Sequence, residues 1–173
     1  MSVIHRCAGW LGVVLSAAVA LASSFSHGQS QPANASFESP TVAAGTRSAA
    51  PAGASWTFTG TAGIERFAPT SDYYGGGHTD SQVAYISATG TVGSRGSIAQ
   101  TISFPSVGYY VVRFAAGRAG QANGVQVSVG GVVVETEIIP RVQGTTTNPQ
   151  LESWWTVPFY VATAGAKEIK FAG

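Results

Sequence analysis

The chain of 173 residues contains little cysteine, little histidine and little charge. A single cysteine cannot form an intrachain disulfide, so a disulfide-stapled fold is excluded. Charged side chains make up 10% of the residues, against about 25% in an average soluble domain. A surface with so few charges has to be covered by hydroxyl, amide and backbone groups, and the chain has 22 glycines. This composition favours an exported β-protein over a cytosolic enzyme.

The chain also lacks an excess of charge of either sign beyond residue 28. Of its nine Lys and Arg residues one, Arg6, precedes that point, which leaves eight basic residues against eight acidic ones. A net charge near zero attracts neither nucleic acid nor anionic membrane surfaces. We therefore expect neither as a partner.

The first 28 residues predict a secretory signal peptide. His5 and Arg6 precede an apolar run at 8–22 that is shorter than a membrane span, and small and polar residues follow. Cleavage is expected after Gly28, with Ala22 as the second choice, and a retained N-terminal anchor is the alternative. We expect a secreted or periplasmic/extracellular protein without a membrane span after cleavage.

Residues 29–173 are expected to form a single all-β domain. No window of a dozen residues free of Gly or Pro shows the helical spacing of apolar positions. Short strand-like runs separated by turn residues recur instead, and many such runs without helices between them indicate an antiparallel sandwich or barrel. The predicted strands are 56–59, 82–87, 98–104, 109–115, 125–129, 132–139, 156–161 and 168–171.

Alternation within these runs predicts which side chains face the core. Alternate residues of 98–104 and of 110–114 are mostly apolar, so these two are expected to be neighbouring core strands. The pair 130–131, Gly-Gly, predicts a two-residue hairpin turn. The final stretch KEIKFAG, 167–173, alternates like a strand with one face on the core, whereas the small and polar segment 41–55 predicts a loop.

Several motifs follow one another in an order that resembles a known family. They are Asn34-Ala35-Ser36-Phe37-Glu38, Trp56-Thr57-Phe58-Thr59-Gly60, Ser81-Gln82-Val83-Ala84-Tyr85-Ile86, Ile98-Ala99-Gln100-Thr101-Ile102 and Ala115-Ala116-Gly117-Arg118. Over residues 34–173 the chain resembles the galactose-binding-like jelly-roll domains of secreted bacterial proteins, and the related plant cell-wall domains that open with an Asn-x-x-Phe-Glu strand. The resemblance implies an antiparallel β-sandwich of jelly-roll type that binds carbohydrate.

The resemblance also implies an opening strand around Phe37 and a closing strand beyond residue 173, so we expect the domain to be truncated at its C-terminus by one strand. Domains of this kind often hold structural calcium between the opening Glu and an Asp of the closing strand. Glu38 matches the first position and is the candidate metal ligand, and a lone edge-strand carboxylate is the alternative. Zinc is not expected, because after cleavage one histidine and no cysteine remain.

Carbohydrate binding requires aromatic faces and forked hydrogen-bonding groups. Tyr73 and Tyr74 beside a glycine run, and Trp154 and Trp155, are the candidate aromatic faces. Neighbouring residues on a strand point to opposite faces, so one member of each pair is expected to pack in the core.

Three polar residues are candidate sugar contacts. Arg113 lies in the middle of a predicted strand, on the face opposite the apolar residues, and so reaches solvent or a ligand. Arg118 and Gln121 match polar positions that recur in the family. For these two, bracing of a loop through backbone carbonyls is the alternative.

No catalytic constellation is expected. Glu135 and Glu137 share one side of a predicted strand and match the carboxyl pair of a glycosidase only crudely. His78 has no Gly-x-Ser-x-Gly elbow to serve. We expect a non-catalytic carbohydrate-binding module. A structural or adhesive domain of a cell-envelope protein is the alternative, and a hydrolase is the third.

Overall fold

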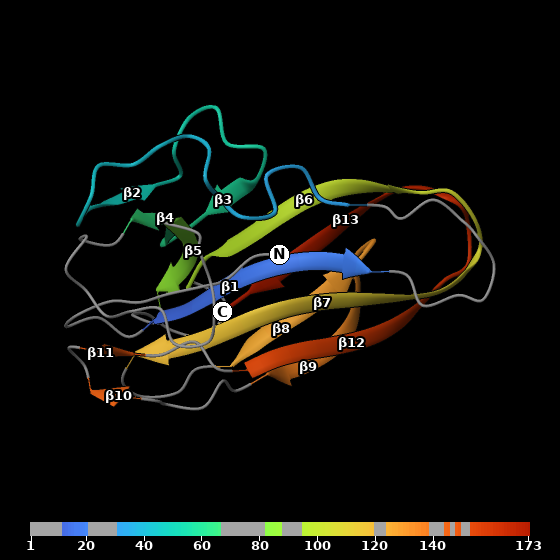
Figure 1. Cartoon of the computed structure of the whole chain (residues 1–173). Coiled ribbons are helices and arrows are strands. Elements are labelled where there is room, and N and C mark those ends of the chain that lie inside the picture. Colours follow the sequence, from blue (N-terminus) through green and yellow to red (C-terminus); the bar gives the residue numbers. More distant parts are fainter. Residues whose placement is uncertain are drawn as a thin grey trace.

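The computed structural model describes residues 12–20, 31–66, 82–87, 95–119, 124–138, 144–145, 148–149 and 153–173. Every helix or strand assigned in these ranges is a β-strand, and no helix there is long and apolar enough to cross a membrane. The strands form antiparallel sheets that pack together (Figure 1). The all-β prediction is confirmed.

The described strands form two larger sheets and one small one. The first has the order β12-β7-β1-β5-β4-β2 and the second the order β3-β6-β13-β8-β9. The strands of the first sheet are β1 (Gly12–Ala20), β2 (Arg47–Ala49), β4 (Ala62–Arg66), β5 (Gln82–Ser87), β7 (Gly108–Ala119) and β12 (Ser153–Val161). Those of the second are β3 (Thr57–Thr59), β6 (Ser97–Phe104), β8 (Val125–Val129), β9 (Val132–Ile138) and β13 (Gly165–Ala172). The small sheet pairs β10 (Gly144–Thr145) with β11 (Asn148–Pro149).

The core lies between the two larger sheets. Phe104 of β6 meets Tyr110 of β7 edge to face, with 4.8 Å between ring centroids. Phe114 of β7 meets Phe171 of β13 at 5.2 Å. All four side chains are buried, as alternation predicts. β6 and β7 are neighbours across the core, in different sheets, and not hydrogen-bonded partners.

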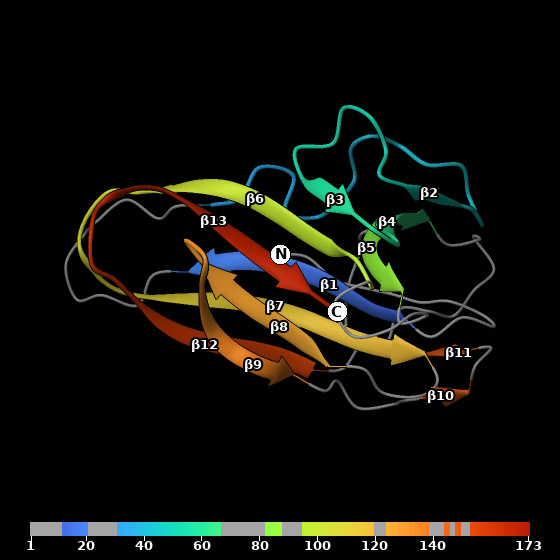
Figure 2. The ribbon, with the colours of Figure 1, turned by 180° about the vertical axis from the view of Figure 1, so that it is seen from behind.

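The connection from β6 to β7 crosses from one sheet to the other. The Tyr110 hydroxyl donates to the carbonyl of Ser106 at 2.7 Å and accepts from its N–H at 3.3 Å. A buried tyrosine thus fixes the turn that precedes its own strand. In both views this connection lies at the same end of the molecule as the one from β12 to β13 (Figures 1 and 2).

The predicted C-terminal strand and the predicted Gly-Gly turn are both confirmed. β13 pairs with β6 on one side and β8 on the other, and its Ile169 and Phe171 are fully buried. It is therefore a central strand, not an edge strand. Gly130 and Gly131 have φ of 57° and 80°, as a two-residue hairpin turn requires.

The expected opening strand around Phe37 is wrong. The Phe37 N–H donates to the Asn34 carbonyl at 3.0 Å, and both residues have positive φ, 59° and 49°. The Asn34 side chain closes the turn by accepting from the Ser39 N–H at 3.1 Å. Asparagine tolerates this conformation because its short amide bonds to nearby backbone. The turn buries Phe37 completely, against Trp56 at 5.1 Å between rings.

Further segments differ from the expectation, among them β4, where no strand was predicted. The predicted loop 41–55 contains β2, which pairs with β4 and carries an ion pair of 3.0 Å between Arg47 and Glu65. Gly63 permits this pairing, since a Cβ there would lie 2.1 Å from the Ser48 carbonyl oxygen. In addition, residues 12–20 of the predicted leader form β1. Strand formation does not test cleavage, so the leader stays a prediction.

Candidate functional site

The predicted site residues fall into three groups. Tyr73, Tyr74 and Gln121 lie outside the described residues. Arg118 and Trp154 lie in β7 and β12, but their side chains are not among those described. The positions of Arg113, Trp155 and Glu38 are described in full.

Trp155 is half-buried and packs against the hydrophobic core. It lies opposite the fully buried Phe114 in the β7–β12 register, and directly paired residues of an antiparallel ladder share a face. The indole is thus on the inner face of the sheet. This placement favours packing over stacking on a ligand, and its role in sugar binding stays a prediction.

Arg113 is exposed on the outer face of β7. Alternation places Tyr109 and Val111 on this same face. In the paired strand β12, the residues opposite these three are Thr156, Pro158 and Tyr160. The outer face at the β12 side of the sheet therefore combines two tyrosines with one guanidinium group.

Tyr109 and Tyr160 lie directly opposite each other and form the most exposed aromatic pair in the described part of the chain. They are 74% and 55% exposed, and their ring centroids are 5.0 Å apart at an interplanar angle of 58°. We call this pair the tyrosine platform. Its members point outward because their neighbours Tyr110 and Phe159 occupy the inner face, where their rings stack at 5.9 Å.

The surroundings of the tyrosine platform are apolar near the turn and cationic farther along the strand. Val107, in the preceding turn, is 51% exposed, and Pro158 is exposed on β12. Arg113 follows Tyr109 by four residues, which is about 13 Å along a strand. The platform lies at the end of the sheet that carries the β6–β7 and β12–β13 connections (Figure 1). An extended ligand along β7 could contact both the rings and the guanidinium.

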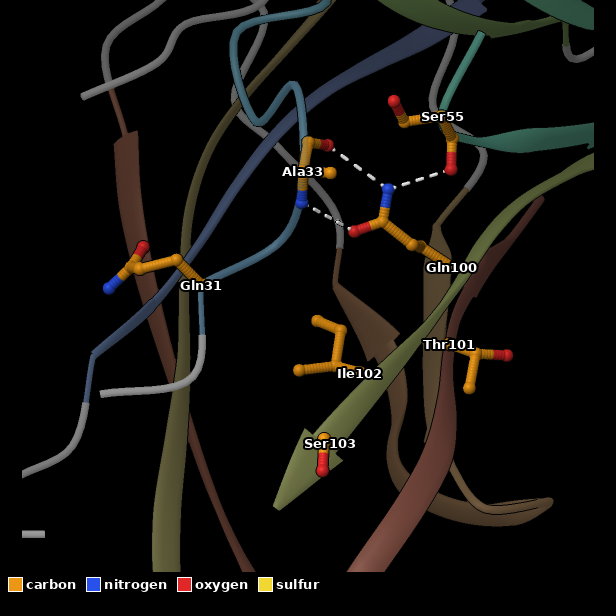
Figure 3. A pocket seen from close by; sticks show the side chains of 7 residues that line it. All are labelled: Gln31, Ala33, Ser55, Gln100, Thr101, Ile102 and Ser103. Carbon is orange, nitrogen blue, oxygen red and sulfur yellow. Dashed lines mark hydrogen bonds between the residues drawn. The ribbon is translucent and has the colours of Figure 1, made fainter. Parts of the chain in front are cut away.

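A second candidate is a groove of about 430 Å³ beside β6 (Figure 3). Two glutamines line it, and the side-chain amide of one, Gln100, accepts from the Ala33 N–H at 2.8 Å and donates to the carbonyls of Ala33 and Ser55 at 3.0 and 2.7 Å. These bonds tie two loops to the strand. The lining residues are Gln31, Ala33, Ser55, Gln100, Thr101, Ile102 and Ser103. Because the lining has no aromatic face and the Gln100 amide is engaged by backbone, the groove resembles a structural brace.

Glu38 accepts a hydrogen bond from the backbone of β5. Its Oε1 accepts from the backbone N–H of Gln82 at 2.8 Å. Among the described residues no group of three or more His, Cys, Asp or Glu side chains could hold a metal ion. Calcium requires six to eight oxygen ligands. Calcium binding at Glu38 stays a prediction.

Sequence reasoning missed Tyr109 and Tyr160, although the pattern contained them. Once Tyr110 is assigned to the core face of β7, alternation places Tyr109 and Arg113 on the opposite, outer face. In the stretch Val157-Pro158-Phe159-Tyr160, alternation likewise places Tyr160 on the outer face if Phe159 is buried. The pairing of the two tyrosines depends on strand register, which the sequence alone does not supply.

No protein-family model, curated protein or solved structure matches the chain. Its function is therefore inferred from the side chains described above.

Proposed function

We propose that the protein is a secreted, non-catalytic carbohydrate-binding module and that its ligand stacks on the tyrosine platform. The observation that carries the proposal is the exposure of Tyr109 and Tyr160 as a paired aromatic surface. The exposed tyrosine rings leave apolar surface in contact with water, which is unfavourable. The apolar C–H face of a sugar ring can cover this surface. The packed antiparallel sheets are compatible with a galactose-binding-like jelly roll, which we propose as the finer fold.

The proposed ligand is an oligosaccharide or polysaccharide rather than a single sugar. The distance of about 13 Å from Tyr109 to Arg113 along β7 exceeds the length of one sugar ring. Arg113 would donate forked hydrogen bonds to hydroxyls of a second ring. Such a shallow and solvated site would bind weakly, because each sugar hydroxyl exchanges water for a similar bond.

A structural or adhesive extracellular domain is the competing function. The apolar side chains beside the platform, above all Val107, would also suit contact with another protein. A protein contact would not depend on glycans, so the same assay separates the two functions.

Affinity gel electrophoresis of the exported protein in gels containing different polysaccharides tests the proposal. We expect retardation by at least one polysaccharide, and about a 2- to 10-fold weaker interaction for Tyr109→Ala or Tyr160→Ala, as loss of one aromatic contact implies. Tyr160→Phe keeps the ring and should retain most of the retardation.

The matched control is Val132→Ala. Val132 is 66% exposed but lies on β9 of the other sheet, so its loss should leave retardation unchanged. Equal loss in Val132→Ala and Tyr109→Ala would contradict the platform. Normal mobility in every polysaccharide would favour the structural or adhesive function.

A further inference from the structure

β1 fills a slot in the middle of the larger sheet. All nine of its residues pair with β7, from Gly12 opposite Ala119 to Ala20 opposite Val111. Four of them also pair with β5, ending with Leu15 opposite Ala84. Both pairings are antiparallel. β1 therefore joins β12-β7 to β5-β4-β2, as Figures 1 and 2 show.

The same nine residues belong to the predicted leader. Both predicted cleavage points, after Ala22 and after Gly28, lie beyond the end of β1. Export with cleavage would therefore remove the strand and leave β5 and β7 with unpaired edges facing each other. Free edges of this kind bind other strands through main-chain hydrogen bonds.

The edge left on β5 would lie in an interior part of the sheet. With β1 in place, each residue from Gln82 to Ile86 is at most 7% exposed, so both faces of β5 are covered in the intact chain. A solvated edge strand normally carries charged side chains or proline to block pairing. β5 has neither in its sequence QVAYIS, which makes its edge a favourable template for a partner strand.

The residues that flank the slot define the chemistry of its occupant. On β7, Val112 and Phe114 to Ala116 are buried, and on β5 every residue from Gln82 to Ile86 is. Where it pairs with β5, an occupant therefore needs apolar side chains on both of its faces and no charge among them. Ala84 and Ala116 lie opposite one common position of the slot, and two alanines leave room there for a branched side chain.

We propose that the exported protein uses the slot between β5 and β7 as an acceptor site for an extended, apolar strand of a different polypeptide, antiparallel to both edges. The inference depends on the export and leader removal of the proposed function but not on sugar binding. A second copy is a poorer donor, because β2 to β13 are already paired in the described residues. A copy would have to break one of its own ladders, whereas a free segment of another protein would not.

The test keeps the full chain and makes β1 exchangeable. A protease recognition sequence replaces residues 23–28, the purified protein is cleaved, and a fluorescent peptide of residues 12–20 is added. We expect saturable binding to the cleaved protein by fluorescence anisotropy, displacement by unlabelled peptide, and no binding to uncleaved protein, whose slot is filled. A peptide with Leu15→Asp places a carboxylate opposite Ala84 and Ala116 and should bind at least about tenfold more weakly.

Three results would overturn the inference. One is a cleaved protein that keeps its β-type dichroism but binds no peptide. Another is a cleaved protein that dimerises and excludes the peptide, since the second copy would then be the occupant. The third is an exported protein whose N-terminal sequence begins before Gly12, because β1 would then never leave. Retardation by polysaccharides, measured on the same samples, reports on the tyrosine platform independently of all three.

Discussion

The side chains of Gln82 and Gln100 each make three hydrogen bonds to backbone, but Gln82 is buried and Gln100 is partly exposed. The fully buried Gln82 side chain accepts from the Val42 N–H and donates to the carbonyls of Phe37 and Pro40 at 2.8 and 3.0 Å. The partly exposed Gln100 side chain likewise makes three bonds to loop backbone. Each amide holds an irregular segment against a strand, Gln82 on β5 and Gln100 on β6.

Replacement of either glutamine by methionine removes all three bonds with little change in length. At Gln82 the three backbone groups lose their partner where water has little access, and each orphaned buried group costs about 1–3 kcal/mol. Part of this is recovered by burying an apolar thioether, so we expect Gln82→Met to lower the free energy of unfolding by about 3 kcal/mol. At Gln100 water replaces the lost partner, and Gln100→Met should cost about 0.5–1 kcal/mol.

Urea unfolding of the full chain, followed by tryptophan fluorescence and circular dichroism, measures both changes. The free energies come from the midpoints and slopes of the transitions, provided that the two probes coincide. Equal losses in the two variants would refute the reasoning, because burial would then have no influence on the value of the bonds. A Gln82→Met protein within about 1 kcal/mol of wild type would refute it as well.

Three further predictions concern the fold. Tyr110→Phe removes the bond of 2.7 Å to the Ser106 carbonyl and should lower stability by about 1 kcal/mol, read as a lower midpoint of thermal unfolding. Gly63→Ala would place a Cβ 2.1 Å from the Ser48 carbonyl oxygen and should lower the free energy of unfolding by about 3 kcal/mol. Gly131→Ala meets open space but keeps a φ of 80°, so it should lower the free energy of unfolding by about 1 kcal/mol in the same urea assay. Burial raises the pKa of Tyr85 above its ordinary value of 10.0, an effect that Arg47 opposes and Glu65 increases. Because the pKa of Tyr85 is higher in the folded than in the unfolded state, the neutral phenol contributes to folding stability. This contribution is complete below pH 10.0 and is lost as the pH rises through the folded pKa. Stability should therefore fall more steeply above that pH in wild type than in Tyr85→Phe, and parallel urea midpoints of the two proteins would contradict the shift.

Strands were predictable where apolar residues alternate or form a short continuous run between turn residues. The predictions at 82–87 and 125–129 coincide with β5 and β8 because these runs are dense in β-branched and aromatic residues. β2 was missed because Arg-Ser-Ala offers no alternation, and β4 because Ala-Gly-Ile-Glu-Arg contains one large apolar residue. Tertiary pairing, not local propensity, makes these two segments strands.

The opening motif was misread for a different reason. A family resemblance predicted a strand where Asn34 supplies turn chemistry, and the buried Phe37 gave the same apolar pattern in both cases. At the candidate site, the outward direction of Arg113 was predictable from alternation. The contact between Tyr109 and Tyr160 was not, because register between strands far apart in sequence depends on the whole sheet.

The pairing of β1 with β7 has a consequence for the timing of synthesis. Gly12 pairs with Ala119, so the first strand leaves the ribosome well before its partner exists. With about 100 residues between them and a translation rate of about 5–20 residues per second, the delay is about 5–20 s. The other neighbour, β5, which pairs with Gly12 to Leu15, follows about 70 residues after β1, so until then the apolar segment has no ladder to join. A segment that forms a central strand of the uncleaved chain is thus made before both of the strands that flank it, β5 and β7.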